Sequence, residues 1–161
     1  MTEAVKNRIL SDIEEITALI TSYGELTGEI LTTDIDETLE DIVAGRDEII
    51  EQVGIKFRDI DEACMECTET EAKQVRKSLK TGNPALGMSP ALKEIHKAAV
   101  NMKSVYISVQ DKENLSRLRV DARVSELRSE LENLRDDKKK LDFYSHNKVG
   151  ENKGGMFDSQ L

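Results

Sequence analysis

The spacing Cys64-Met65-Glu66-Cys67 is the feature of this chain that comes closest to known chemistry, because C-x-x-C pairs bind metals or exchange disulfides. A structural zinc site needs four ligands and a catalytic one at least three. The sequence offers no second C-x-x-C, and His96 and His146 lie far along the chain. Redox pairs normally begin a helix after a strand, whereas this pair lies inside a helical pattern. We therefore interpret both cysteines as small core thiols and expect no metal.

Other chemical patterns are also incomplete. Glu94-Ile95-His96 has the wrong spacing for a di-metal Glu-x-x-His motif, and Gly82–Gly87 lacks the lysine and hydroxyl of a phosphate-binding loop. The acidic repeats at 34–37 and 59–62 lack the glycine and glutamate of a calcium loop. Two histidines so placed form no nucleophile–base pair. We expect no enzyme and no cofactor.

The composition favours long amphipathic helices. Of the 161 residues, 38% are hydrophobic and 34% charged, but only 4% are aromatic, which disfavours a sheet or a thick globular core. No apolar run reaches membrane-spanning length, so we expect no membrane insertion. Residues 1–10 lack a signal-peptide core, and we expect a cytoplasmic protein with reduced thiols.

Charge is distributed unevenly along the chain. Residues 1–70 carry 5 basic and 19 acidic side chains (5 − 19 = −14), and residues 71–161 carry 18 and 13 (18 − 13 = +5). Either the two halves complement each other, or the basic half meets an acidic partner. Nucleic acid is disfavoured as that partner because aromatic residues do not interleave with the basic ones.

Apolar spacing predicts three helices, over about 3–31, 34–79 and 90–142. The first two carry stripes at steps of three and four, and the break at Thr33-Asp34 bears capping residues. Gly24-x-x-x-Gly28 in the first helix is compatible with close helix approach. The second stripe keeps its phase through Gly45 and Gly54, and it includes two charged residues: Ile35, Leu39, Ile42, Arg46, Ile49, Val53, Lys56, Ile60, Ala63 and Cys67.

The third helix follows a loop at 80–89, with Ser89 as N-cap and Pro90 in the first turn. Its apolar stripe has polar occupants between Val109 and Val120. The fold class predicted is all-α: an antiparallel bundle of three long helices with coiled-coil character over 1–144, and a flexible tail over 145–161. The last helix is very long and ends near Phe143 and Tyr144.

Three features of the sequence resemble the flagellar export chaperones of the FlgN type. They are the helical order with "GRDEIIEQV" in the second helix, "ENLSRL" in the last helix, and the ending "YSHNKVGENKGGMFDSQL". Ser145 after Tyr144, where family members often have glycine, and the C-x-x-C depart from the family pattern.

The resemblance implies a cytoplasmic type III secretion chaperone that binds hook–filament junction proteins and delivers them to the flagellar export gate. We expect the exposed face of the last helix to bind a client helix, steered by nearby arginines (Arg117, Arg119, Arg123, Arg128 and Arg135). The predicted partner-binding residues are Val120, Val124, Leu127, Leu131, Leu134, Leu141, Phe143, Tyr144 and Phe157.

Several alternatives stay open. The same stripe fits burial in the protein's own bundle or in a homodimer. The chain also fits a self-assembling coiled-coil scaffold without a client, or a chaperone of the related filament-cap type. A metal site at the C-x-x-C is the remaining alternative.

Overall fold

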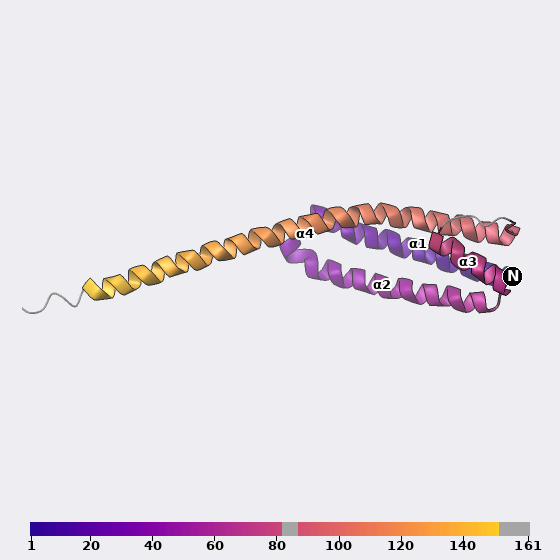
Figure 1. Ribbon diagram of the computed structural model, residues 1–161, viewed down its shortest axis with the longest axis horizontal. Coiled ribbons are helices and arrows are strands. Elements are labelled where there is room, and N and C mark those ends of the chain that lie inside the picture. The colour runs from indigo at the N-terminus through magenta and orange to yellow at the C-terminus, as the bar shows by residue number, and fades with distance from the viewer. Residues whose placement is uncertain (82–86, 152–161) are drawn as a thin grey trace, which may run out of the picture. The chain divides into compact units, whose positions relative to one another are not determined.

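The computed structural model describes residues 1–81 and 87–151, and side chains at 1–34, 36–81 and 87–144. These residues form four helices and no strand: α1 (Glu3–Thr32), α2 (Ile35–Met65), α3 (Glu69–Thr81) and α4 (Pro90–Glu151) (Figure 1). The all-α class and the very long last helix are confirmed. The chain divides into two compact units, Met1–Arg119 and Val120–Leu161, which we describe separately.

Capping side chains explain where the helices begin. Thr2 accepts a hydrogen bond from the amide of Val5 at 3.3 Å and begins α1. Asp34, rather than the neighbouring threonine, caps α2 by accepting from the amide of Asp36 at 3.1 Å. Ser89 begins α4 as predicted, with its Oγ accepting from the amide of Leu92 at 3.4 Å. Each cap satisfies an amide that the first helical turn leaves without a partner.

The prediction of a single helix over 34–79 is wrong, because the chain breaks between Met65 and Glu69. Thr68 and Glu71 form a capping box: the Thr68 amide donates to Glu71 Oε2 at 3.1 Å, and the Glu71 amide donates to Thr68 Oγ1 at 3.4 Å. The T-x-x-E spacing of that box is visible in the sequence. The apolar stripe keeps its spacing as far as Cys67, just past the end of α2, and the step of five from Cys67 to Ala72, a buried residue of α3, is a second sign of the break.

At its far end α4 continues to Glu151, whereas the sequence predicted a tail from residue 145. The physical reason is that no proline or glycine interrupts the segment before Gly150. Residues 152–161, including the predicted partner-binding Phe157, lie outside the described residues.

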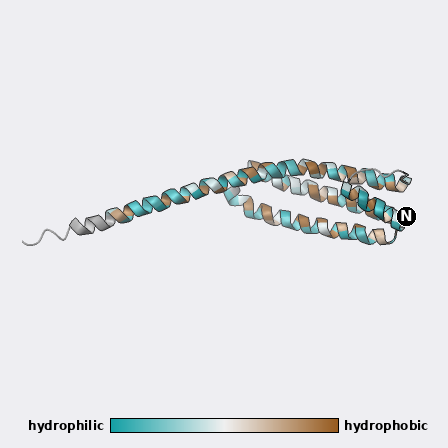
Figure 2. Cartoon of the chain, viewed as in Figure 1, coloured by the Kyte–Doolittle hydropathy of each residue, from teal (hydrophilic) through white to brown (hydrophobic). Residues whose placement is uncertain are grey.

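The core of the first unit lies where α3 joins the other helices. Its fully buried members include Ile9, Ile13, Ile16, Ile60, Val75 and Ile95. Figure 2 shows hydrophobic and hydrophilic residues alternating along the helices, which is the pattern of helices that bury one face only.

Polar contacts between the helices of this unit show which helices run parallel and which run antiparallel. Arg8 pairs with Glu66 at 2.8 Å near one end of α1, so α1 and α2 run in opposite directions. Lys6 pairs with Glu94 at 3.0 Å, and Ser116 Oγ donates to the carbonyl of Thr27 at 2.9 Å. The two residues of the first pair are 88 positions apart in the sequence, and those of the second pair are 89 positions apart. Because this separation is nearly constant, α1 and the first part of α4 run in the same direction.

The polar interval between Val109 and Val120 is where α4 meets the end of α1. Arg119 donates to the carbonyl oxygens of Ile30 at 2.7 Å and Thr33 at 2.9 Å. The last turn of α1 has no basic residue of its own, so Arg119 satisfies carbonyls that would otherwise lack partners. The interruption of the apolar stripe is therefore a set of specific polar contacts.

Candidate functional site

The predicted client-binding stripe lies on the second unit and is largely exposed. Exposed fractions run from 36% at Leu127 to 68% at Leu141, with Val124, Leu131 and Leu134 between these limits, while Val120 is partly buried. Within this chain the stripe is therefore not part of a core. An apolar helix face of this kind is open to another helix.

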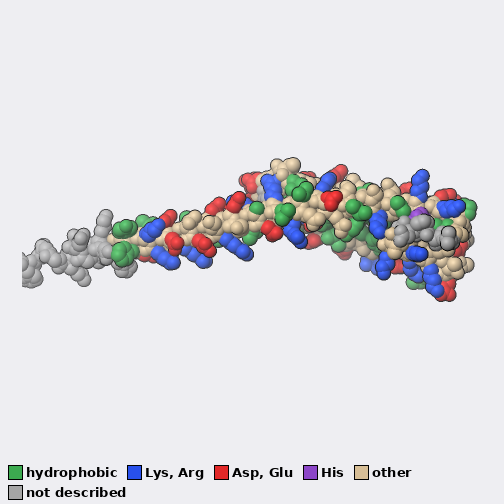
Figure 3. All heavy atoms as spheres, turned by 45° about the horizontal axis from the view of Figure 1, so that its top comes forward, with side chains coloured by type: hydrophobic (Ala, Val, Ile, Leu, Met, Phe, Trp, Pro, Cys, Tyr) green, Lys and Arg blue, Asp and Glu red, His purple; other side chains and the backbone are tan. Residues whose placement is uncertain are grey.

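Charged side chains of the second unit pair along the helix. Arg123 Nη1 lies 3.3 Å from both Glu126 and Glu130, and the i,i+3 pairs Lys139–Asp136 and Lys140–Asp137 measure 3.4 Å. Figure 3 shows positive and negative side chains mixed on the visible face of this segment. Such pairs support the helix and leave the apolar stripe as its distinctive surface.

The arginines expected to steer an acidic partner do not act as one group. Arg119 caps the end of α1, and Arg123 lies between two glutamates. Arg119 has a structural role as well, because its guanidinium donates to two carbonyls in the first unit; that it also steers a partner stays a prediction. The sequence could not show this structural role, since the contact joins residues 86 and 89 positions apart.

Phe143 and Tyr144 form an exposed aromatic pair beyond the stripe. Their ring centroids are 6.1 Å apart with planes at 75°, an edge-to-face arrangement. Both side chains are about two-thirds exposed, at 64% and 66%. They add exposed aromatic surface, and aromatic residues are enriched at protein interfaces.

Of the two cysteines, Cys64 belongs to the core of the first unit and Cys67 packs against that core. Cys64 is buried and Cys67 partly buried, and both are free thiols. Burial is the main cause that raises the pKa of each thiol, which disfavours the thiolate needed for metal binding or exchange. Among the described residues no three His, Cys, Asp or Glu side chains gather as a metal site. Burial confirms the interpretation of Cys64 as a core thiol, and the partly buried Cys67 packs against the same core.

A polar cluster joins α1, α2 and α4 within the first unit. Arg46 Nη2 lies 2.7 Å from Glu113 Oε1, donates to the Tyr23 hydroxyl, and holds its guanidinium carbon 4.5 Å from the centroid of the Tyr23 ring. Burial opposes the charge of Arg46, but the hydrogen bonds to Tyr23 and Glu113 raise its pKa. The charged residue in the apolar stripe is thus explained by its partners on two other helices.

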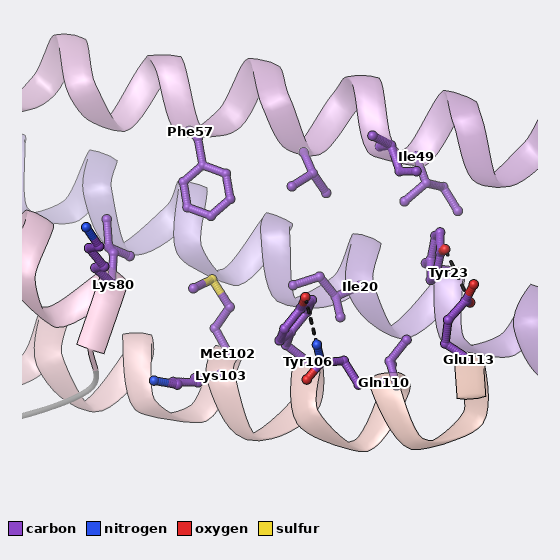
Figure 4. A pocket seen from close by; sticks show the side chains of 14 residues that line it. Ile20, Tyr23, Ile49, Phe57, Lys80, Met102, Lys103, Tyr106, Gln110 and Glu113 are labelled. Carbon is purple, nitrogen blue, oxygen red and sulfur yellow. Dashed lines mark hydrogen bonds between the residues drawn. The ribbon is translucent and has the colours of Figure 1, made fainter. Parts of the chain in front are cut away.

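Next to this cluster lies an apolar groove that the sequence did not reveal. It encloses about 560 Å³ and is lined from α1, α2, α4 and the end of α3. In Figure 4, Phe57 points from α2 toward Met102 of α4, while Lys80 and Lys103 lie near one end. We call this site the α2–α4 groove; Ile50, Val53, Phe57, Met102, Tyr106 and Val109 form its apolar walls.

Comparison with known proteins gives this chain no relative: no family profile, no curated protein and no solved structure matches it. In the part of the chain that the structure describes, no helix is both long enough and apolar enough to cross a bilayer.

Proposed function

We propose that this protein is a flagellar type III secretion chaperone of the FlgN type. It binds hook–filament junction proteins in the cytoplasm and delivers them to the export gate. The observation that carries the proposal is the exposed apolar stripe of the second unit, from Val124 to Leu141. The family assignment itself rests on the sequence resemblance.

The stripe supports a binding function for a physical reason. Its leucines recur at steps of four, three and seven, so one face of α4 offers apolar side chains to a second helix. Burying such side chains against a partner would stabilise the complex by roughly 25 cal/mol per Å² of apolar surface removed from water. The finer architecture that we propose, an antiparallel three-helix bundle with coiled-coil character, fits this mode because it presents whole helix faces to partners.

Substituting aspartate for Leu127 and Leu131 tests the proposal. We expect the double variant to lose capture of a hook–filament junction protein in a pull-down from flagellated cells. Helicity by circular dichroism should be unchanged, since both leucines are exposed at 36% and 55%. The matched control places aspartate at Ser125 and Ser129, exposed positions on the opposite face of the same helix.

Two results would contradict the proposal. Unfolding of the leucine variant, with the serine variant intact, would mean that the stripe is core. Equal capture by both variants would place client binding elsewhere.

Deleting residues 145–161 then tests the C-terminal segment: loss of secretion with retained client binding would make it a delivery element.

A self-assembling coiled-coil scaffold is the second candidate, favoured by the same stripe, because two copies of one apolar face can pair with each other. Sedimentation velocity of the purified protein separates the two. A stable dimer that Leu127→Asp and Leu131→Asp convert to monomer, with no client captured by the native protein, would favour the scaffold.

A further inference from the structure

All lining residues of the α2–α4 groove belong to the first unit, and none of them belongs to the stripe on the second. Its walls carry apolar side chains that are unusually exposed for a helical interior: Ile50 at 56%, Tyr106 at 49% and Phe57 at 38%. The groove therefore leaves apolar surface in contact with water that a bound group would cover.

The helix α3 shows what fits between these walls. It contacts α2 through Arg76 and Asp61 at 2.9 Å, and α4 through Ser78 and His96 at 3.3 Å. It also buries Ala72 and Val75 in the core. Between α2 and α4, α3 thus occupies the position of an additional helix.

The groove continues from the point where α3 ends. Leu79 and Lys80, from the last turn of α3, line one end of it, and Lys103 Nζ donates to the carbonyl of Thr81 at 3.1 Å there. Beyond that end, α2 and α4 still form both walls (Figure 4). The groove is therefore continuous with the interface that α3 makes with α2 and α4.

The length and the charges of the groove indicate what kind of ligand fits it. Met102 and Glu113 on α4 mark the extent of the groove and are three turns apart, about 16 Å. The end beside α3 carries the ammonium groups of Lys80 and Lys103, whereas Glu113 at the other end is already paired with Arg46. An acidic group is complementary to the lysine end.

We propose that the α2–α4 groove binds an amphipathic helix of a partner protein, about three turns long, with an acidic side chain at the end that meets Lys80 and Lys103. Apolar residues of that helix at steps of three and four fill the space between Phe57 and Met102. The bound helix continues along the line of α3 between α2 and α4, and it buries the exposed side chains of Ile50 and Tyr106.

A synthetic peptide provides the probe. It is a fluorescein-labelled 14-residue helix, a length of roughly four turns, with leucines on one face and glutamates at both ends. A peptide of the same composition, with its leucines scattered around the helix, is the control ligand. By fluorescence anisotropy we expect the striped peptide to bind the full-length protein roughly tenfold more tightly than the scattered one.

Substitution at the rim locates the binding. Ile50→Glu should weaken binding of the striped peptide roughly tenfold. Val43→Glu is the matched control, because Val43 lies on the same helix, is 43% exposed and is outside the groove. If Ile50→Glu alters the helicity, Tyr106→Glu on α4 provides the second test from the opposite wall.

Charge reversal at Lys80 tests whether an acidic end of the bound helix meets the lysine end of the groove. Lys80→Glu should weaken the glutamate peptide and strengthen one in which lysines replace the glutamates, each by roughly two- to fivefold. Lys77→Glu, also exposed on α3 but outside the groove, should change neither. A purely structural role of Lys80 would weaken both peptides alike.

Three outcomes would overturn the proposal. The striped and scattered peptides could bind equally, or Ile50→Glu and Val43→Glu could have equal effects on binding. The third is that the native protein forms a homodimer which excludes the peptide and which Ile50→Glu dissociates. The last would assign the groove to a second copy of this chain. The Leu127→Asp and Leu131→Asp variant should bind the peptide normally, so failure here and failure of the proposed client site are distinguishable.

Discussion

Gly24 of α1 lies against Val109 of α4 so closely that a Cβ added to Gly24 would be 2.6 Å from Val109 Cγ2. Carbon atoms do not pack at that distance, and the β-branched valine has little freedom to rotate away. Gly28, one turn further along α1, has open space around it. The two glycines of the G-x-x-x-G spacing thus have different roles.

Gly24→Ala should lower the free energy of unfolding by about 1–3 kcal/mol, the usual cost of overpacking. Gly28→Ala should raise it by about 0.5–1 kcal/mol, because alanine is the better helix former and meets no neighbour. Urea denaturation of the two variants measures both changes. Equal effects of the two substitutions would contradict the close approach of α1 and α4 at Gly24.

Arg119→Met should destabilise the first unit by about 1–2 kcal/mol, because the carbonyl oxygens of Ile30 and Thr33 lose a charged donor. The control is Arg117→Met, an exposed position on the same helix, where the change should stay near zero. Hydrogen exchange should rise at the end of α1 in the first variant only. Unchanged exchange there would argue against capping by Arg119.

Glu71 should make stability depend on pH. The ammonium group of Met1, at 2.6 Å, and hydrogen bonds from Thr68 lower the pKa of Glu71 from 4.5 to about 2. Because the folded state favours the carboxylate, this stabilisation is complete above about pH 4.5 and is lost as pH falls toward 2. Glu71→Gln should therefore be less stable than the native protein at pH 7, with a difference that shrinks below pH 4.5.

Urea denaturation between pH 3 and pH 7 measures this dependence. Glu69→Gln is the control, since that side chain is 84% exposed and should barely alter the profile. A constant difference between native protein and Glu71→Gln across the acidic range would show that Glu71 keeps its ordinary pKa.

Thiol labelling should separate the two cysteines. Cys64 is buried and Cys67 partly buried, and burial raises the pKa of both, so both should react more slowly than an unfolded control at pH 8. We expect iodoacetamide to modify Cys67 first, and Cys64 only when urea unfolds the protein. Cys67→Ser leaves Cys64 alone for the measurement by mass spectrometry. Rapid modification of Cys64 in the folded variant would contradict its place in the core.

Composition and apolar periodicity determined the helical class and the first helix to within a residue at its end, and capping residues determined the start of the last helix at Ser89-Pro90. These features depend on the local sequence, because helix faces and caps are set by residues three or four positions apart. The capping box at Thr68 and Glu71 was equally local and could have been predicted.

Only the tertiary structure decided which of several equivalent patterns are buried. The sequence gives the residues around Ile13 and Leu131 the same apolar spacing, yet Ile13 is 1% exposed and Leu131 is 55% exposed. It also could not pair Arg46 with Glu113, or place Arg119 at the end of α1, because these contacts join distant segments. Burial and pairing depend on which helices pack together, and a single helix does not encode its neighbours.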